Sequence, residues 1–469
     1  MKDLHFSRIF AMTPYKSLTL LLAEMSLCKD FIGCGTGDPY PLSKESLLPE
    51  ETVAHGTYTL RAGRAVRFFT RFFPYASYAL CANADAGEVG LLFRLPTTDA
   101  RITLTKDAIR FCEGETERAL PTPFPFTHLI VTARPGAFDL YFKTEGKTEF
   151  FATLSAPTFA SSHKESVFRK GGVYLFAEGS CRVHSLSSYM DSGVSLADLR
   201  PIRYETGECM VEGGKIFLTA SVRMQEGAYQ GILSWIPGTC EFALVGALFF
   251  DSGDGILAND VAASILYDRK SARYLLWVCS FAHDHILGYA DFTADPRFGI
   301  NVIDISLMPR ACEEDDRHSF LGFFGDEDPD LIYDEENDRW LFAVCRLFPN
   351  EGYRYLFFAS HNPFSGFSYL GEGKTKDETG GSFVTLDGAL AFVCGAGFDT
   401  PSLYPVYTKD GARHLSFDHP DGGFRGWGTV IPVKAGTRTR EYLITFDRHG
   451  GSDYRWSYGT LYLFERSAL

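Results

Sequence analysis

The sequence predicts an all-β fold, in which a jelly-roll β-sandwich is followed by a five-bladed β-propeller. Strand-like runs of four to eight residues recur along the chain between Gly, Asp, Asn and Pro, and long helical periodicity is nearly absent. Aromatic residues make up 15% of the chain, and aromatic side chains favour strands. A repeat that begins near residue 200 is the third observation, because propeller blades recur at such spacing.

The length and charge of the chain limit its organisation and its partners. With 469 residues, there is room for two or three domains, and we expect an N-terminal extension over 1–50, a sandwich over 51–192 and a propeller over 193–469. The formal net charge of -14 repels phosphate backbones, so nucleic-acid binding is not expected.

Targeting and cysteine patterns point to the cytoplasm. The apolar run Leu18–Met25 contains Glu24 and is too short to span a membrane. It makes a poor signal peptide, because the cationic start is weak and no clean small-residue cleavage site follows. None of the 11 cysteines has CxxC or zinc-site spacing, and Cys279, Cys345 and Cys394 stand in apolar runs. We therefore expect buried free thiols in a reducing compartment, with no metal, no cofactor and no membrane partner.

Strands within residues 55–190 have the size and rhythm of a two-sheet sandwich. From residue 200 onward, five segments share one layout: a polar residue opens an apolar strand, a turn follows, and a second apolar strand ends in a polar residue. The segments start at the marker residues Glu208, Asp260, Asp328, Ser382 and Gly428, which are 52, 68, 54 and 46 residues apart. Five repeats of this length predict five blades. The last repeat is one strand short, and we expect a strand near 190–205 to close the ring.

The repeat predicts which side chains meet at one end of the central channel. The first strand of each blade lines the channel, and the second runs antiparallel to it, so the start of one and the end of the other share a face. The first-strand starts are the five marker residues. The second-strand ends are Arg223, Phe281, Arg346, Phe398 and Arg448 with His449.

Converging carboxylates would suit glycosidic cleavage. Burial and mutual repulsion separate the pKa values of neighbouring carboxyl groups, so one can donate a proton while another is ionised. Hydrolysis of a glycosidic bond needs this asymmetry. The arginines would hold ionised carboxylates or bind substrate oxygens, and they leave open an anionic sugar substrate. Trp427 is a candidate platform for a sugar ring.

Three of these segments resemble those of the arabinanase, levansucrase and β-fructosidase group of five-bladed propeller glycoside hydrolases. Asp328-Pro329 is similar to their Asp-Pro inner-strand motif, Asn259-Asp260 to their Asn-Asp segment, and Glu208-Cys209 to their acid/base segment. The resemblance covers roughly 200–469. In those enzymes the acids run Asp, Asp, Glu along the chain, and an accessory sandwich, where present, usually follows the propeller. Here the order is Glu208, Asp260, Asp328, and the sandwich, which resembles concanavalin-like jelly rolls in its closing strands, comes first.

The resemblance implies roles for these acids. Asp260 would be the nucleophile or base, Asp328 the group that stabilises the transition state, and Glu208 the acid/base, with Glu378 as its rival because Asp260, Asp328 and Glu378 restore the family order. The implied substrate is an oligosaccharide or glycoside, most simply a fructofuranoside or arabinofuranoside. Two alternatives stay open: a carbohydrate-binding propeller without catalysis, and a propeller scaffold with no small ligand. The oligomeric state cannot be read from the sequence.

Overall fold

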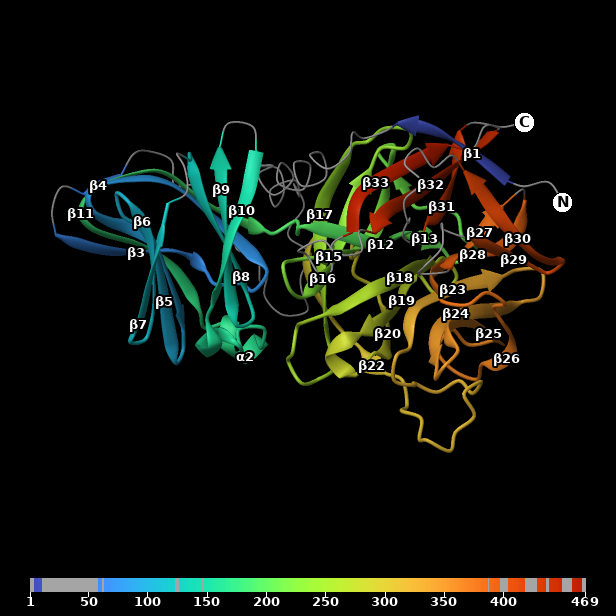
Figure 1. Ribbon diagram of the computed structural model, residues 1–469. Helices are drawn as coiled ribbons and strands as arrows, with labels where there is room; N and C mark the ends of the chain where they lie inside the picture. Colours follow the sequence, from blue (N-terminus) through green and yellow to red (C-terminus); the bar gives the residue numbers. More distant parts are fainter. Residues whose placement is uncertain are drawn as a thin grey trace. The chain divides into compact units, whose positions relative to one another are not determined.

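The computed structural model describes residues 4–10, 58–60, 63–122, 126–144, 147–386, 388–396, 404–417, 428–435, 438–448 and 458–465. These residues are almost entirely in strands (Figure 1), which confirms the predicted all-β class. The chain divides into two compact units. One comprises Met1–Leu18, Gly193–Gly253 and Ala258–Leu469, and the other comprises Thr19–Ser192 and Asp254–Leu257.

The first unit is a five-bladed propeller, as predicted. Its innermost strands contact one another in a closed ring, in the order β12, β18, β23, β27, β31 and back to β12. Blade 1 contains β12 (Ser195–Pro201), β15 (Lys215–Arg223), β16 (Ala228–Trp235), β17 (Phe242–Asp251) and β21 (Gly299–Asp304), with β14 (Val211–Glu212) beside β15. Blade 2 contains β18 (Asp260–Asp268), β19 (Arg273–Ser280), β20 (Ile286–Phe292) and β22 (Ser306–Leu307), with β13 (Arg203–Tyr204) parallel to β18.

The other three blades have four strands each. Blade 3 is built from β23 (Glu327–Asp334), β24 (Arg339–Phe348), β25 (Gly352–Ser360) and β26 (Ser368–Glu372). Blade 4 is built from β27 (Glu378–Leu386), β28 (Ala389–Ala396), β29 (Pro405–Thr408) and β30 (Gly411–Phe417). Blade 5 is built from β31 (Thr429–Ala435), β32 (Arg438–Arg448), β33 (Tyr458–Glu465) and β1 (Leu4–Phe10).

One expectation about the strands of the ring is wrong. The strand near 190–205 does not complete the last blade: it is β12, the inner strand of blade 1. The missing strand of blade 5 is β1, which pairs antiparallel with β33 and parallel with β30 of blade 4. This N-terminal strand therefore closes the ring by hydrogen bonding across the junction between blades 4 and 5.

Apolar side chains between neighbouring blades form the core of the propeller. Trp277 of β19 is fully buried and packs against Phe342 of β24, with ring centroids 4.6 Å apart. Cys279, Cys345 and Cys394 are buried free thiols in these layers, as their apolar surroundings predicted. Burial of this much apolar surface is the main stabilising contribution, at about 25 cal/mol per Å².

The second unit contains one sheet of ten hydrogen-bonded strands. Two strands, β4 (Ala76–Leu95) and β11 (Gly172–Met190), pair along nearly their full length and join the rest. The other elements are β2 (Tyr58–Leu60), β3 (Arg64–Arg71), β5 (Thr98–Leu104), β6 (Ala108–Glu113), β7 (Thr116–Pro121), β8 (His128–Arg134), β9 (Ala137–Thr144), β10 (Lys147–Ser155), η1 (Pro157–Phe159) and α2 (Glu165–Phe168). The predicted jelly-roll sandwich stays a prediction, since these hydrogen bonds join all ten strands into one sheet. Among the described residues, no helix has the length and apolarity needed to cross a membrane.

Candidate functional site

Four of the five inner strands contain the same irregularity near their start. In β12, β18, β23 and β27, two residues face a single residue of the neighbouring strand, which is a β-bulge. The first residue of each bulge has a left-handed backbone, with φ of 53° at Asp198, 57° at Ala262, 49° at Asp328 and 61° at Gly380. Such conformations are strained for residues other than Gly and are concentrated at functional sites. Blades 1 and 3 place an aspartate at this position.

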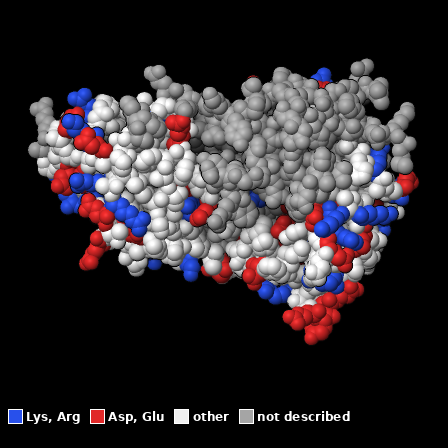
Figure 2. Space-filling view, viewed as in Figure 1, with Lys and Arg blue, Asp and Glu red and all other residues white. Residues whose placement is uncertain are grey.

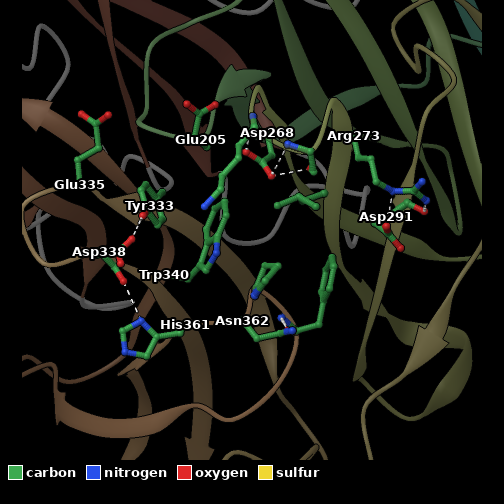
Figure 3. A pocket seen from close by; sticks show the side chains of 15 residues that line it. Glu205, Asp268, Arg273, Asp291, Tyr333, Glu335, Asp338, Trp340, His361 and Asn362 are labelled. Carbon is green, nitrogen blue, oxygen red and sulfur yellow. Dashed lines mark hydrogen bonds and ion pairs between the residues drawn. The ribbon is translucent and has the colours of Figure 1, made fainter.

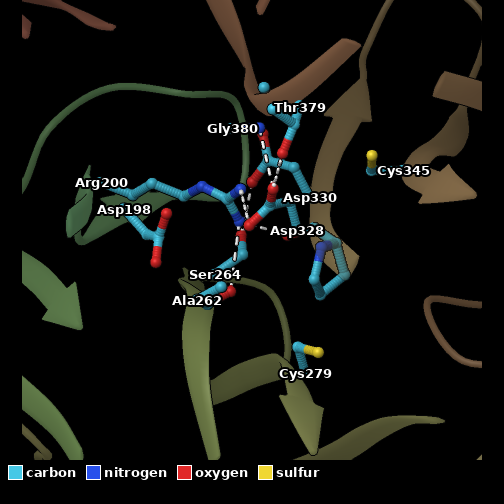
Figure 4. Close-up of polar contacts among 12 residues, drawn as sticks. Asp198, Arg200, Ala262, Ser264, Cys279, Asp328, Asp330, Cys345, Thr379 and Gly380 are labelled. Atoms are coloured by element: carbon cyan, nitrogen blue, oxygen red, sulfur yellow. Dashed lines mark hydrogen bonds and ion pairs between the residues drawn. The ribbon is translucent and has the colours of Figure 1, made fainter. Parts of the chain in front are cut away.

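The carboxyl group of Asp328 is fixed by blades 1 and 4. Its Oδ2 accepts hydrogen bonds from the Thr379 hydroxyl at 2.6 Å and from the Gly380 backbone N–H at 2.8 Å. Its Oδ1 lies 3.7 Å from the Arg200 guanidinium. Figure 4 shows both side chains. Arg200 is itself buried, and its Nη1 donates to the Pro329 carbonyl at 2.6 Å. The carboxylate therefore has one defined orientation at the centre of the ring.

Asp198 is the second acid of this constellation. Its Oδ2 accepts a hydrogen bond from the Ser221 hydroxyl at 2.6 Å and lies 3.7 Å from Arg223 Nη2. Burial and then the charge of Asp328 raise the pKa of Asp198, against the opposing effects of Arg223, Ser221 and Arg200. The neighbouring carboxylate of Asp328 therefore contributes to the raised pKa of Asp198.

Glu327, the residue before Asp328, is the third acid. Its Oε1 lies 3.2 Å from His285 Nδ1 and accepts a hydrogen bond from the Tyr353 hydroxyl at 3.3 Å. Burial raises its pKa, the charges of Asp328 and Asp198 raise it further, and the hydrogen bond with His285 lowers it. The Glu327 side chain is 23% exposed, compared with 6% for Asp328 and 5% for Asp198. It is therefore the acid of the three that solvent reaches most easily.

Asp260 and Glu378 occupy equivalent places, two residues before the bulge positions of blades 2 and 4. Asp260 begins β18, is buried and pairs across the ladder with Ser280. Glu378 begins β27 and is fully buried; its carboxylate accepts hydrogen bonds from the Tyr355 N–H at 3.1 Å, the Thr375 N–H at 2.9 Å and the Tyr407 hydroxyl. Burial raises the pKa of Glu378. Its hydrogen bonds connect it to blades 3 and 4.

Glu208 does not lie on an inner strand, contrary to the sequence-based expectation. It precedes β14 in blade 1, its side chain is 39% exposed, and its Oε1 accepts a hydrogen bond from Lys434 Nζ at 2.7 Å. The position is wrong because the pattern starting at Glu208 marks the hairpin of β14 and β15, whereas the inner strand of blade 1 comes earlier. Asp198 on β12 takes the place that Glu208 was expected to take.

Of the arginines predicted at the channel mouth, Arg223 in blade 1 lies beside an acid of the site, whereas Arg346 in blade 3 is held inside the protein. Arg223 ends β15, the second strand of blade 1, and lies 3.7 Å from Asp198, an acid that the repeat did not predict. Arg346 is 1% exposed and uses all five of its N–H groups inside the protein. Two go to Asp326 at 2.7 and 2.8 Å, and three go to the backbone carbonyls of Arg317, Ser319 and Leu321. It offers no free donor to a substrate.

Arg346 anchors the long loop over 308–326. Figure 2 shows a group of acidic side chains at the lower edge of the molecule, where Figure 1 shows this loop between β22 and β23.

The predicted Phe281 lies in the short helix η2 (Phe281–His283), directly after β19. His449 and Trp427 lie outside the described residues, as does the side chain of Arg448. No group of three or more His, Cys, Asp or Glu among the described residues is arranged to hold a metal ion.

A separate cavity of about 800 Å³ lies at the other ends of β18 and β23 (Figure 3). Several of its charged groups are engaged in local structure: Asp268 accepts hydrogen bonds from the backbone of Lys270 and Ser271, and Arg273 pairs with Asp291. None of the predicted site residues lines it. The candidate site is therefore assigned by its converging acids and not by the volume of this cavity.

Replacing Asp198 by Asn is expected to stabilise the protein near neutral pH by a few degrees in Tm. Because the pKa of Asp198 is raised on folding, its ionisation costs stability as the pH rises from the unfolded pKa of about 4 through the higher folded value. Asn cannot ionise and avoids this cost. Thermal unfolding of both proteins between pH 3.5 and 8 checks this: the Tm difference should grow with pH and vanish at the acidic end. A variant that is less stable at pH 8 would contradict it.

Comparison with known proteins gives matches among solved structures only. No family model matches the chain, and no curated protein matches it. Similar structures include an endo-1,4-β-xylanase from Bacteroides thetaiotaomicron, at 13% identity over 62% of this chain and 90% of that one, with a TM-score of 0.33. An α-L-arabinofuranosidase from Podospora anserina is 11% identical over 59% of this chain and 92% of that one, with a TM-score of 0.39.

A family 117 glycoside hydrolase from Zobellia galactanivorans is 10% identical over 58% of this chain and 84% of that one, with a TM-score of 0.40. Glycoside hydrolases are thus among the solved structures that are similar to this chain. The chemistry of the chain has to follow from its own site residues.

Proposed function

We propose that this protein hydrolyses a glycosidic bond at the end of the propeller channel where the inner strands begin. The observation that supports this most directly is the grouping of Asp198, Glu327 and Asp328. These three carboxyl groups come from blades 1 and 3, and the charge of Asp328 raises the pKa of both of the others. Proton donation near neutral pH requires a carboxyl group whose pKa is raised, and burial beside another carboxylate has this effect.

The surroundings of each acid favour a division of labour. Asp328 is held by Thr379, Gly380 and Arg200 at the centre of the ring, which suits a carboxylate that stabilises the positive charge developing on the sugar. Asp198, with its raised pKa, is suited to accept a proton from the attacking water. Asp260, buried at the start of β18, is the alternative base and keeps the role that the sequence resemblance gave it.

The substrate class follows from the sequence resemblance. The Asn259-Asp260 and Asp328-Pro329 segments, on which that resemblance rests, both stand at the start of an inner strand. This supports a furanoside, such as a fructoside or an arabinoside, as the substrate to test first. Arg223 lies beside Asp198, an acid of the site, so it is a residue through which an anionic sugar would be held.

A screen of the pure protein against chromogenic furanosides, pyranosides and fructo-oligosaccharides tests the proposal. We expect hydrolysis of at least one furanoside, and the Asp198→Asn variant, prepared in the same way, should lack it. NMR of the first-formed anomer then shows whether the reaction retains or inverts configuration. Saturable sugar binding without any turnover would overturn the proposal in favour of a carbohydrate-binding propeller.

A further inference from the structure

Three aromatic rings lie next to the most exposed acid of the site. Phe324 belongs to the 308–326 loop and is 66% exposed, the largest exposed fraction among the large apolar side chains that the structure describes. Its ring stacks on His285, with centroids 5.6 Å apart and planes 28° apart. Phe281 meets the same imidazole edge-on, with centroids 4.1 Å apart. We call Phe281, His285 and Phe324 the aromatic shelf.

A defined turn on one side and a buried arginine on the other hold the shelf in place. His285 and the preceding Asp284 both have left-handed backbones, with φ of 57° and 58°, so the turn before β20 is tightly defined. On the other side, Phe323 lies under the Arg346 guanidinium, 4.2 Å from its carbon to the ring centroid. Arg346 is itself fixed by five hydrogen bonds. The position of Phe323 is therefore fixed, and so is the backbone from which the next residue, Phe324, extends.

The shelf is connected directly to Glu327. His285 supplies the ring on which Phe324 stacks, and its Nδ1 lies 3.2 Å from Glu327 Oε1. The titratable groups around Glu327 are His285 and Cys279 from blade 2, Tyr353 and Cys345 from blade 3, and the carboxyl groups of Asp198 and Asp328. An exposed aromatic surface and a partly exposed carboxyl group therefore adjoin, while the more buried acids lie toward the centre of the ring.

We propose that the aromatic shelf binds the leaving group of the substrate and that Glu327 donates the proton to the glycosidic oxygen. This inference rests on the proposed hydrolase function and specifies its acid and one of its binding sites. The ligand class is a sugar or aryl group with an apolar face, since such a face can stack on Phe324 and His285. The sequence analysis gave this role to Glu208 or Glu378. Glu208 lies away from the inner strands. The carboxylate of Glu378 already accepts three hydrogen bonds inside the protein.

The proposed step balances in atoms and electrons. As the bond between the anomeric carbon and the glycosidic oxygen breaks, its electron pair stays on the oxygen, which takes the proton of the Glu327 carboxyl group and departs as an alcohol. Water adds to the anomeric carbon and gives one proton to the Asp198 carboxylate. Release of that proton to solvent and reprotonation of Glu327 restore the site, so the net reaction is addition of one water across the bond.

The test is a leaving-group series on the Glu327→Gln variant. Substrates share one sugar and carry either a 2,4-dinitrophenolate, which departs without protonation, or an alkyl or sugar alcohol, which needs it. We expect kcat/KM to fall roughly 10²–10⁴-fold for the alcohols and to change by less than about 10-fold for the dinitrophenyl substrate. Equal losses on both would overturn the assignment of Glu327. Glu335→Gln, at an exposed turn residue at the far end of the same hairpin, is the matched control and should change neither rate.

A second variant tests the shelf itself. Phe324→Ala should raise KM about 3–10-fold for substrates with a sugar or aryl leaving group and leave KM unchanged for a methyl glycoside. Phe68→Ala, at a Phe that is 62% exposed in the other unit, is the control. An equal change for both substrate classes would overturn the leaving-group assignment. A complete lack of hydrolysis by the unmodified protein would instead overturn the proposed function, so the two failures are distinguishable.

Discussion

Replacing Asp328 by Asn should abolish hydrolysis, with kcat falling roughly 10³–10⁵-fold as for other acids that act as part of a catalytic unit. Asp328 lies at the centre of the inner-strand ring, where Arg200, Thr379 and Gly380 hold its carboxylate. Asn keeps the shape of this side chain and removes its charge. The developing positive charge on the sugar then loses its nearest stabilising carboxylate.

The fold should survive this change, because Asn tolerates a left-handed backbone and Asp328 has a φ of 49°. The amide oxygen of Asn can still accept a hydrogen bond from Gly380, so we expect Tm to stay within a few degrees. Asp338→Asn is a matched control: Asp338 also has a φ of 49°, lies in the turn of the same β23–β24 hairpin, and should keep full activity. Activity of the Asp328→Asn protein within 10-fold of the unmodified protein would remove Asp328 from the mechanism.

The sequence predicted the repeating part of this architecture well, for a physical reason. Inner strands that are buried on both faces have short apolar sequences bounded by turns. Four of the marker residues lie in or next to such a strand: Asp260, Asp328, Ser382 and Gly428. Each of these strands is followed by an antiparallel partner after a tight turn, which makes the repeat visible. The placement of Asp260 and Asp328 at the starts of inner strands needed no long-range information.

Blade 1 could not be read in the same way. Its inner strand, β12, has the sequence SLADLRP, in which two bulge residues and Arg200 interrupt the alternation expected of a strand. Asp198 was missed for this reason, although the four bulges show that it is equivalent to Asp328. The closing strand β1 was missed because its partners β30 and β33 lie more than 400 residues away in sequence, and no local pattern encodes such a pairing.

Arg346 shows the same limit for a single side chain. The repeat places it beside Arg223 as a channel residue, and a sequence pattern does not reveal which donors are already used. Only the structure shows that the 308–326 loop turns its carbonyl groups toward this guanidinium. Arg346 therefore contributes to stability. Through its contact with Phe323 it also helps to position Phe324 in the aromatic shelf.

Replacing Arg346 by Leu should cost about 3–5 kcal/mol of unfolding free energy. The change leaves the fully buried Asp326 carboxylate without its cation and three loop carbonyls without their donor. Because Arg346 lowers the pKa of Asp326 against the larger effect of burial, its loss raises that pKa further. Protonation then relieves part of the penalty, so the destabilisation should be smaller at pH 5 than at pH 8. Urea unfolding at both pH values measures it.

Arg354→Leu is the matched control, because Arg354 lies directly opposite Arg346 on β25. Its side chain is 29% exposed and pairs with Glu351 and Glu372 near the surface, so its loss should cost at most about 1 kcal/mol. If Arg346→Leu does not fold, Arg346→Lys keeps the charge but cannot reproduce the five-donor pattern, and it should give an intermediate loss. Equal stability of the Arg346 and Arg354 variants would mean that the loop is held by its apolar contacts alone. In that case Phe324 would keep its position without the guanidinium, and the aromatic shelf would not depend on it.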